Sequence, residues 1–164
     1  MIRPLHTYAI TSVVTFVLAS ASVAAAGYTR IHASACQAIG SVTYANGKWK
    51  NNSGSSADLD CPVEDSDLHA KSTVPYVDTH LYNPVGGPPY NVAQLCVMHY
   101  WGGASGEDCD YAVNDLGLSG SHAIRTYVSS SSYVWKNGGN VYDYPFVSVS
   151  LRPQAELTGV LVYY

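Results

Sequence analysis

Apolar and polar residues alternate over short stretches of this chain, and helical periodicity is weak everywhere after residue 26. The clearest alternation is at Val147, Val149 and Leu151, which are separated by serines. A period of two is typical of a half-buried antiparallel strand. Shorter alternations or apolar runs between turn residues predict further strands over Ser41–Tyr44, Lys48–Asn51, Ala57–Val63, Ser72–Tyr82, Val92–Tyr100, His122–Val128 and Val160–Tyr164.

Turn residues separate these strands at short intervals, as they do in sandwiches and barrels. Asn46-Gly47 is the strongest hairpin signal, because both residues tolerate positive φ. Asn83–Tyr90 is rich in proline and glycine and predicts a loop. The acidic, glycine-containing stretch Gly102–Asp110 predicts a second loop.

Two of the predicted strands carry a signal about their place in the sheets. Pro75 removes a backbone donor, so Ser72–Tyr82, or the part around the proline, is expected at a sheet edge. Val92–Tyr100 contains the unbroken apolar run Leu95–Met98. Such a run indicates a central strand with both faces covered.

The first 26 residues have the layout of a secretory signal peptide. Arg3 gives a positive start, Tyr8–Leu18 is mostly apolar, and small residues end in Ala24-Ala25-Ala26. This pattern predicts a signal-peptide helix over residues 1–26 with cleavage after the last of these alanines. The apolar stretch is shorter than the roughly 20 residues of a membrane span. We therefore expect the protein to be secreted, either to the periplasm or outside the cell.

Residues 27–164 show no internal repeat and no long linker, so we expect a single domain. Its many short strands predict an all-β fold. The architecture expected is an antiparallel β-sandwich with Greek-key or jelly-roll-like connections.

Four cysteines follow the leader, and an even number in an exported protein predicts two disulfides. We favour Cys36–Cys61 and Cys96–Cys109, because both bonds join neighbours along the chain. The alternative is a metal site, but the cysteines lack the spacing of zinc ligands.

The formal net charge of the chain is −4, and its basic residues do not cluster. A phosphate backbone would be repelled, so nucleic acid is not an expected partner. Once the leader is removed, we do not expect the protein to bind a membrane. A glycan or a cell-surface molecule is the partner class that stays open.

Two acidic segments lie in predicted loops and could bind a hard cation such as calcium. Neither has the spacing of an EF-hand, and ordinary solvated charge is the alternative. The candidate ligands are Glu64, Asp65 and Asp67 in the first segment, and Glu107, Asp108 and Asp110 in the second.

Catalytic motifs are missing from the sequence. Cys96 and His99 could form a nucleophile pair, but Cys96 is expected to be bridged. No G-x-S-x-G element is present, and no glutamate lies in a recognisable strand-end motif for glycoside cleavage. We therefore expect no enzyme and no cofactor.

The chain is rich in tyrosine, with 14 tyrosines and 3 tryptophans in total. Exposed aromatic rings can stack on sugars, whereas buried ones are ordinary sheet residues. The candidate ligand-binding residues are Trp101, Trp135, Tyr142 and Tyr144.

Several short motifs resemble a group of small exported bacterial proteins, many from myxobacteria and related bacteria. They are Ser34-Ala35-Cys36-Gln37, Tyr44-Ala45-Asn46-Gly47, Asn52-Ser53 and Leu59-Asp60-Cys61-Pro62-Val63, followed by a cysteine pair in short register. The resemblance implies a secreted, disulfide-bonded β-sandwich and no particular activity.

The sequence thus predicts a secreted structural or binding domain without catalysis. A carbohydrate- or calcium-binding module that uses the loops at one end of the sandwich is the first alternative. A small secreted hydrolase is the second.

Overall fold

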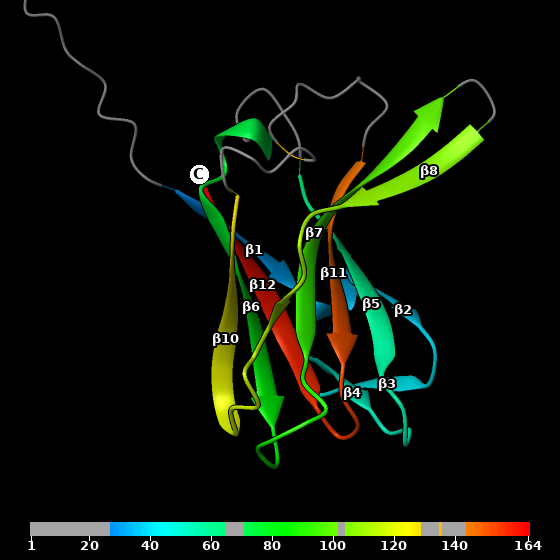
Figure 1. The fold of residues 1–164 in the computed structure, drawn as a ribbon, viewed down its shortest axis with the longest axis vertical. Helices are drawn as coiled ribbons and strands as arrows, with labels where there is room; N and C mark the ends of the chain where they lie inside the picture. The colour runs from blue at the N-terminus through cyan, green and yellow to red at the C-terminus, as the bar shows by residue number, and fades with distance from the viewer. Residues whose placement is uncertain (1–26, 65–70, 102–103, 129–134, 136–143) are drawn as a thin grey trace, which may run out of the picture.

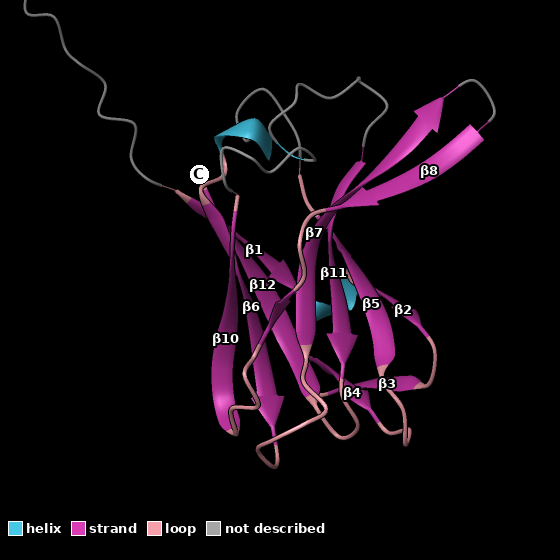
Figure 2. Cartoon of the chain, in the orientation of Figure 1, coloured by secondary structure: helices cyan, strands magenta, loops and turns pink. Residues whose placement is uncertain are grey.

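The computed structural model describes residues 27–64, 71–101, 104–128, 135 and 144–164. These residues form two antiparallel sheets, and most of their long strands lie along the long axis of the molecule in Figure 1. Figure 2 shows that strands and short connections make up nearly all of the described chain. The prediction of an all-β, antiparallel fold is confirmed. The predicted signal-peptide helix lies outside the described residues.

Sheet A has the strand order β10-β6-β12-β4-β3, and β1 pairs with the other half of β12, on the same side as β4. Its strands are β1 (Tyr28–His32), β3 (Val42–Ala45), β4 (Lys48–Asn51), β6 (Tyr76–Asn83), β10 (Gly120–Tyr127) and β12 (Glu156–Tyr163). The β3–β4 hairpin turns at Asn46 and Gly47, where φ is 52° and 80°. The hairpin predicted from this dipeptide is confirmed.

Sheet B has the order β2-β5-β11-β7-β8, with β9 also paired to β7. Its strands are β2 (Gln37–Ile39), β5 (Ala57–Pro62), β7 (Val92–Trp101), β8 (Ala104–Cys109), β9 (Val113–Asn114) and β11 (Tyr144–Leu151). Strand β7 is an interior strand, as its apolar run predicted.

One hydrophobic core lies between the sheets, because alternate residues of each strand point inward. Sheet A contributes Val77, Leu81, Ile124, Leu157, Val160 and Val162, and sheet B contributes Leu59, Cys61, Leu95, Val97, Val147, Val149 and Leu151. Trp135 completes this core and is fully buried. Two 3₁₀ turns, η1 (Ala33–Ala35) and η2 (Lys71–Thr73), are part of the connections. In the described part of the chain, no helix has the length and apolar character needed to cross a bilayer.

Both predicted disulfides are present, Cys36–Cys61 and Cys96–Cys109. The first joins the segment after η1 to β5, so it fixes the crossing from sheet A to sheet B. The second joins residues that face one another in the β7–β8 register. Two disulfides indicate an oxidising, non-cytoplasmic environment.

Two expectations about local structure are wrong. Strand β6 is an interior strand between β10 and β12, not an edge strand. Pro75 precedes it, so no ladder donor is lost, and the Pro75 carbonyl accepts a hydrogen bond from the Val128 amide. The predicted loop Gly102–Asp110 contains β8, because pairing with β7 outweighs its weak strand propensity.

Three strands escaped the sequence pattern: β1, β2 and β9. Each has five residues or fewer, which is too short for a convincing alternation. Strand β12 also begins earlier than predicted, at Glu156.

A buried polar cluster around Asp115 holds together the loops at one end of the sandwich. The Oδ2 atom of Asp115 accepts hydrogen bonds from the Nδ2 atoms of Asn83 and Asn91, both at 2.6 Å. The same oxygen lies 3.2 Å from Nε2 of His122. The Gly117 amide donates to Oδ1 at 3.0 Å. Asp115 therefore connects the end of β6, the start of β7 and the β9–β10 loop.

Burial tends to raise the pKa of Asp115. The hydrogen bonds from Asn83, Asn91, the Gly117 amide and His122 outweigh burial and leave this pKa below its usual range. A carboxyl with a lowered pKa stabilises the fold fully above its unfolded-state pKa, about 3.9. This stabilising contribution is lost as the pH falls through the pKa that Asp115 has in the folded state.

Replacing Asp115 with Asn should therefore lower the free energy of unfolding at pH 7 by about 3 kcal/mol, because buried donors lose a charged acceptor. The difference between wild type and variant should shrink as the pH falls below about 4. Urea unfolding between pH 2.5 and 7 measures both effects. Asp58→Asn, at an exposed carboxylate on β5, is the matched control and should change stability by less than about 0.5 kcal/mol. A wild-type advantage that stays constant with pH would contradict this prediction.

Candidate functional site

Four tyrosines form a continuous row across the outer face of sheet A. Tyr28 of β1 faces Tyr163 of β12 in the strand register, and Tyr127 of β10 faces Tyr76 of β6. The β6–β12 register places the two inner tyrosines side by side, with Val77 opposite Val162 one residue away. We call Tyr28, Tyr163, Tyr76 and Tyr127 the tyrosine row.

The rings of the tyrosine row contact one another in order. The ring centroids are 6.1 Å apart for Tyr28 and Tyr163, 4.4 Å for Tyr163 and Tyr76, and 5.9 Å for Tyr76 and Tyr127. All three pairs are tilted. The two end tyrosines are 62% and 65% exposed, and the two inner ones are half-buried. The row therefore offers a ridged aromatic strip to solvent.

A β-bulge in β12 determines that Tyr163 faces outward. Leu157 faces Leu81 and Gly159 faces His80, so Thr158 is an extra residue without an opposite partner. One extra residue shifts all later side chains to the other face of the strand. Leu157 and Val160 can therefore both be buried, while Tyr163 reaches the surface.

A bidentate ion pair lies directly beside the tyrosine row. Arg125 of β10 donates from Nε and Nη2 to the two carboxylate oxygens of Asp78, both at 2.7 Å. Its guanidinium also lies over the ring of Tyr76, 4.2 Å from the centroid. Hydrogen bonding to Asp78 raises the pKa of Arg125 above its ordinary value, although burial opposes this shift. Arg125 is therefore a permanent cation with an ordered position.

The environment of Tyr163 favours its uncharged form. Burial raises the pKa of the Tyr163 phenol, and the nearby charge of Asp78 adds to this effect. Tyr163 therefore keeps its proton at neutral pH and can donate a hydrogen bond.

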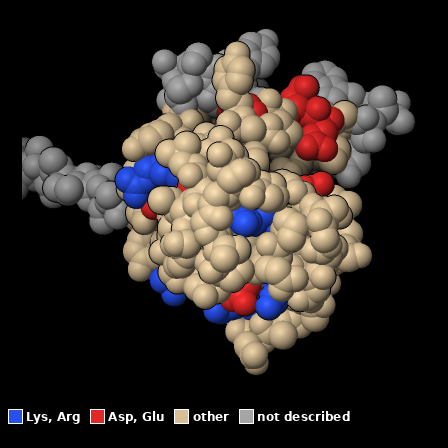
Figure 3. Space-filling view, turned by 60° about the horizontal axis from the view of Figure 1, so that its bottom comes forward, with Lys and Arg blue, Asp and Glu red and all other residues tan. Residues whose placement is uncertain are grey.

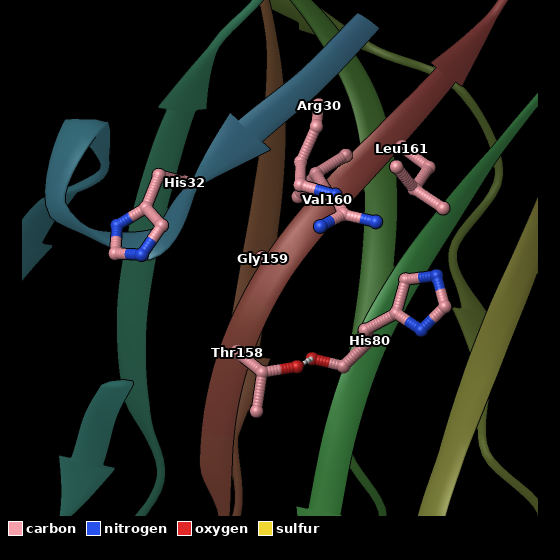
Figure 4. Close-up of a pocket in the computed structure, with 7 residues that line it drawn as sticks. All are labelled: Arg30, His32, His80, Thr158, Gly159, Val160 and Leu161. Atoms are coloured by element: carbon pink, nitrogen blue, oxygen red, sulfur yellow. Dashed lines mark hydrogen bonds between the residues drawn. The ribbon is translucent and has the colours of Figure 1, made fainter. Parts of the chain in front are cut away.

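Further along the same face is a hollow above Gly159, with a volume of about 340 Å³. Gly159 lies opposite both His32 of β1 and His80 of β6, so its missing side chain leaves a gap between two histidines. Figure 4 shows His32 and His80 on either side of β12, with the side chain of Arg30 extending over that strand. We call this space the Gly159 hollow; it is lined by Arg30, His32, His80, Thr158, Gly159, Val160 and Leu161.

Part of the lining of the Gly159 hollow is polar. Thr158 Oγ1 donates to the carbonyl of His80 at 3.0 Å, an interaction drawn in Figure 4. Nε2 of His80 is buried and has no hydrogen-bond partner among the described residues. Nδ1 of His32 lies 3.0 Å from Ser34 Oγ, which holds this ring at the rim.

The predicted aromatic candidates do not form a site together. Trp135 is 0% exposed, and its Nε1 donates to the carbonyl of Cys96 at 3.0 Å. Its interpretation as a stacking residue is wrong, because the ring fills the core. Tyr144 is exposed at the start of β11, in sheet B. Trp101 ends β7, and Tyr142 lies outside the described residues.

The acidic candidates are only partly described. Glu64 is exposed just after β5, whereas Asp65 and Asp67 lie outside the described residues. In the second segment, Glu107 and Asp108 are exposed on β8, and Asp110 follows that strand. Figure 3 shows acidic side chains gathered on the side of the molecule where β8 lies in Figure 1.

The described carboxylates of these segments form no group of three around a common point. In the described part of the chain, the group of potential metal ligands within 4.8 Å of one another is Cys96, Glu107 and Cys109. Both sulfur atoms belong to one disulfide, and metals are bound by the thiolate. Asp108 instead pairs with His99, with Nε2 and Oδ2 3.2 Å apart. Calcium binding by the first acidic segment stays a prediction.

Sequence reasoning missed the tyrosine row. The one available signal was local: Arg125 and Tyr127 share the outer face of a predicted strand. That four tyrosines of four strands lie in one line depends on strand order and register, which the alternation does not contain.

Comparisons with known proteins assign this chain to no family. No protein-family model matches the sequence, and no curated protein matches it either. Among solved structures, the chain is similar to the carbohydrate-binding module TmCBM61 in complex with β-1,4-galactotriose. The identity is 12%, the match covers 86% of this chain and 88% of that one, and the TM-score is 0.34. A TM-score this low gives no residue correspondence between the two chains. The candidate site is therefore argued only from the geometry described above.

The floor of the Gly159 hollow also supports a prediction about stability. Gly159 has a φ of +153°, and an added Cβ would lie 2.8 Å from the backbone oxygen of Ile31. Gly159→Ala should therefore push β1 away from β12 and lower the free energy of unfolding by about 2 kcal/mol. Chemical denaturation measures the change.

Gly54→Ala is the matched control, because an added Cβ at Gly54 meets nothing within 4 Å. It should leave the unfolding midpoint nearly unchanged. Equal stability of the two alanine variants would contradict the role assigned to Gly159.

Proposed function

We propose that this protein is an exported, non-catalytic module that binds an oligosaccharide on the outer face of sheet A. The tyrosine row is the observation that carries the proposal. Its rings lie on a sheet surface rather than in the end loops first considered from the sequence. Large aromatic side chains exposed together on a soluble domain are typical of an interaction surface.

A sugar ring suits this surface for two reasons. Its C–H face is apolar and stacks on an aromatic ring, and its hydroxyls need polar partners at the edge of the ring. The tyrosine row supplies exposed rings and phenol hydroxyls, and Arg125 adds further donors beside Tyr76. Four neighbouring strands about 4.8 Å apart span about 14 Å, which suits several linked sugars better than one.

The surroundings of the row support binding rather than catalysis. Glycoside cleavage requires two carboxyl groups that can act on the scissile bond. Asp78 has both oxygens bound to Arg125, and Glu156 is paired with Lys48 at 3.1 Å. Among the described residues of this face, the carboxylates are therefore already engaged.

Tyr28→Ala and Tyr127→Ala should each weaken oligosaccharide binding about tenfold, because each removes an exposed ring worth about 1.4 kcal/mol of contact. The test is a screen of soluble neutral and acidic polysaccharides by affinity electrophoresis. Titration calorimetry with fragments of the best ligand then measures the affinity.

Tyr111→Ala is the matched control, since Tyr111 is 94% exposed and lies between β8 and β9, outside sheet A. It should bind like the wild type. Loss of binding in this variant as well, or no effect of either substitution in the row, would contradict the proposed site.

Export is the second part of the proposal, and it is supported by the leader-like sequence of residues 1–26, the two disulfides and the resemblance to exported bacterial proteins. Cleavage after Ala26 would leave Gly27 as the first residue. Its carbonyl accepts a hydrogen bond from the amide of Tyr164 at 3.0 Å, so the new terminus would stay attached to β12.

Intact-mass analysis of the protein from its native source should therefore give residues 27–164 with no free thiol. A reduced sample should gain the mass of four hydrogens. An uncleaved amino terminus together with four reactive thiols would refute export.

A further inference from the structure

The outer face of sheet A carries a cation without an acidic partner. Arg30 of β1 is exposed and lies opposite Leu161. The nearest carboxylate in the same register is Asp78, which lies opposite Leu161 on the other side and is engaged by Arg125 through both oxygens. Within the described residues, Arg30 has no ion pair, and its side chain lines the Gly159 hollow.

The charge of this face differs from that of the whole chain. Its described cations are Arg30, Arg125, Lys48 and Lys50, and its described carboxylates are Asp78 and Glu156, both ion-paired. The chain as a whole has a net charge of −4. An excess of positive charge on one face of an acidic protein favours an anionic group at that face.

The Gly159 hollow has the size and the donors for such a group. Its volume of about 340 Å³ is at the lower end of the range of ligand pockets. A planar guanidinium binds a carboxylate through two parallel hydrogen bonds, which gives both affinity and orientation. His80 also lines the hollow, and its buried Nε2 has no hydrogen-bond partner among the described residues.

The hollow and the tyrosine row can be reached by one ligand. Arg30 follows Tyr28 by two residues on the same strand face, a separation of about 7 Å. A chain of sugars lying on the tyrosines can thus place a substituent of one ring next to Arg30.

We propose that the ligand is an acidic oligosaccharide whose sugar rings contact the tyrosine row and whose uronic-acid carboxylate binds Arg30 in the Gly159 hollow. This inference rests on the proposed function and specifies its ligand class. A nucleic acid also combines rings with anions, but Lys48 and Arg125 of this face are already paired with carboxylates, which leaves few charges for a phosphate backbone.

The experiment compares uronic-acid oligosaccharides with their carboxyl-reduced forms, which keep the linkage and lose the charge. Wild-type protein should bind the acidic form about tenfold more tightly, and added salt should reduce that preference. Arg30→Gln should remove the preference while leaving affinity for the reduced form within about twofold, and Arg30→Lys should keep part of it.

Lys50→Gln is the matched control, because it removes the same charge from β4 of the same sheet, outside the hollow. It should keep the preference for the acidic form. Thermal unfolding of each variant verifies that it is folded. Tyr28→Ala should weaken the acidic and reduced forms alike.

The outcomes separate the two proposals. Equal affinity for the acidic and reduced forms, or equal losses in Arg30→Gln and Lys50→Gln, overturns the acidic ligand and leaves the binding face intact. Failure to bind any neutral or acidic polysaccharide overturns the proposed function and this inference with it. If the protein binds a ten-residue oligothymidylate and none of the polysaccharides, both proposals are likewise overturned.

Discussion

One extra residue in β12 determines which side chains half of sheet A presents to solvent. Up to Leu157 the strand follows one alternation, and after Gly159 it follows the opposite one, because Thr158 has no partner in β6. Without this bulge, Tyr163 would point into the core and Val162 would point to water. Gly159 makes the bulge possible, since its backbone has a positive φ and approaches Ile31 closely.

The tyrosine row and the Gly159 hollow depend on this bulge, and the Asp78–Arg125 pair, which the β6–β10 register forms, lies on the same face. They occupy successive positions along the same strands, so backbone hydrogen bonds of the sheet fix their spacing. A site built on paired strands loses little conformational freedom when a ligand binds. The proposed binding surface therefore does not depend on a deep pocket.

The remaining features of the fold keep this face in place. Strand β1 carries Tyr28, Arg30 and His32, and the chain then crosses to sheet B, where the Cys36–Cys61 disulfide anchors it. At the ends of β6 and β10 far from the tyrosine row, the Asp115 cluster ties the connecting loops together. Both restraints act on the parts of these strands that lie away from the tyrosine row.

The sequence by itself determined the strand class, the Asn46-Gly47 hairpin, the interior position of β7 and the cysteine pairing. These features depend on contacts between residues that are close in the chain or on a period of two, both of which a single sequence displays. Trp135 was a candidate ligand-binding residue and lies in the core, and Gly102–Asp110 was predicted as a loop and contains β8. The tertiary structure alone decided the tyrosine row and the pairing of Asp78 with Arg125, because alternation tells which residues share a face of one strand, whereas strand order and register arise from hydrogen bonds between distant segments.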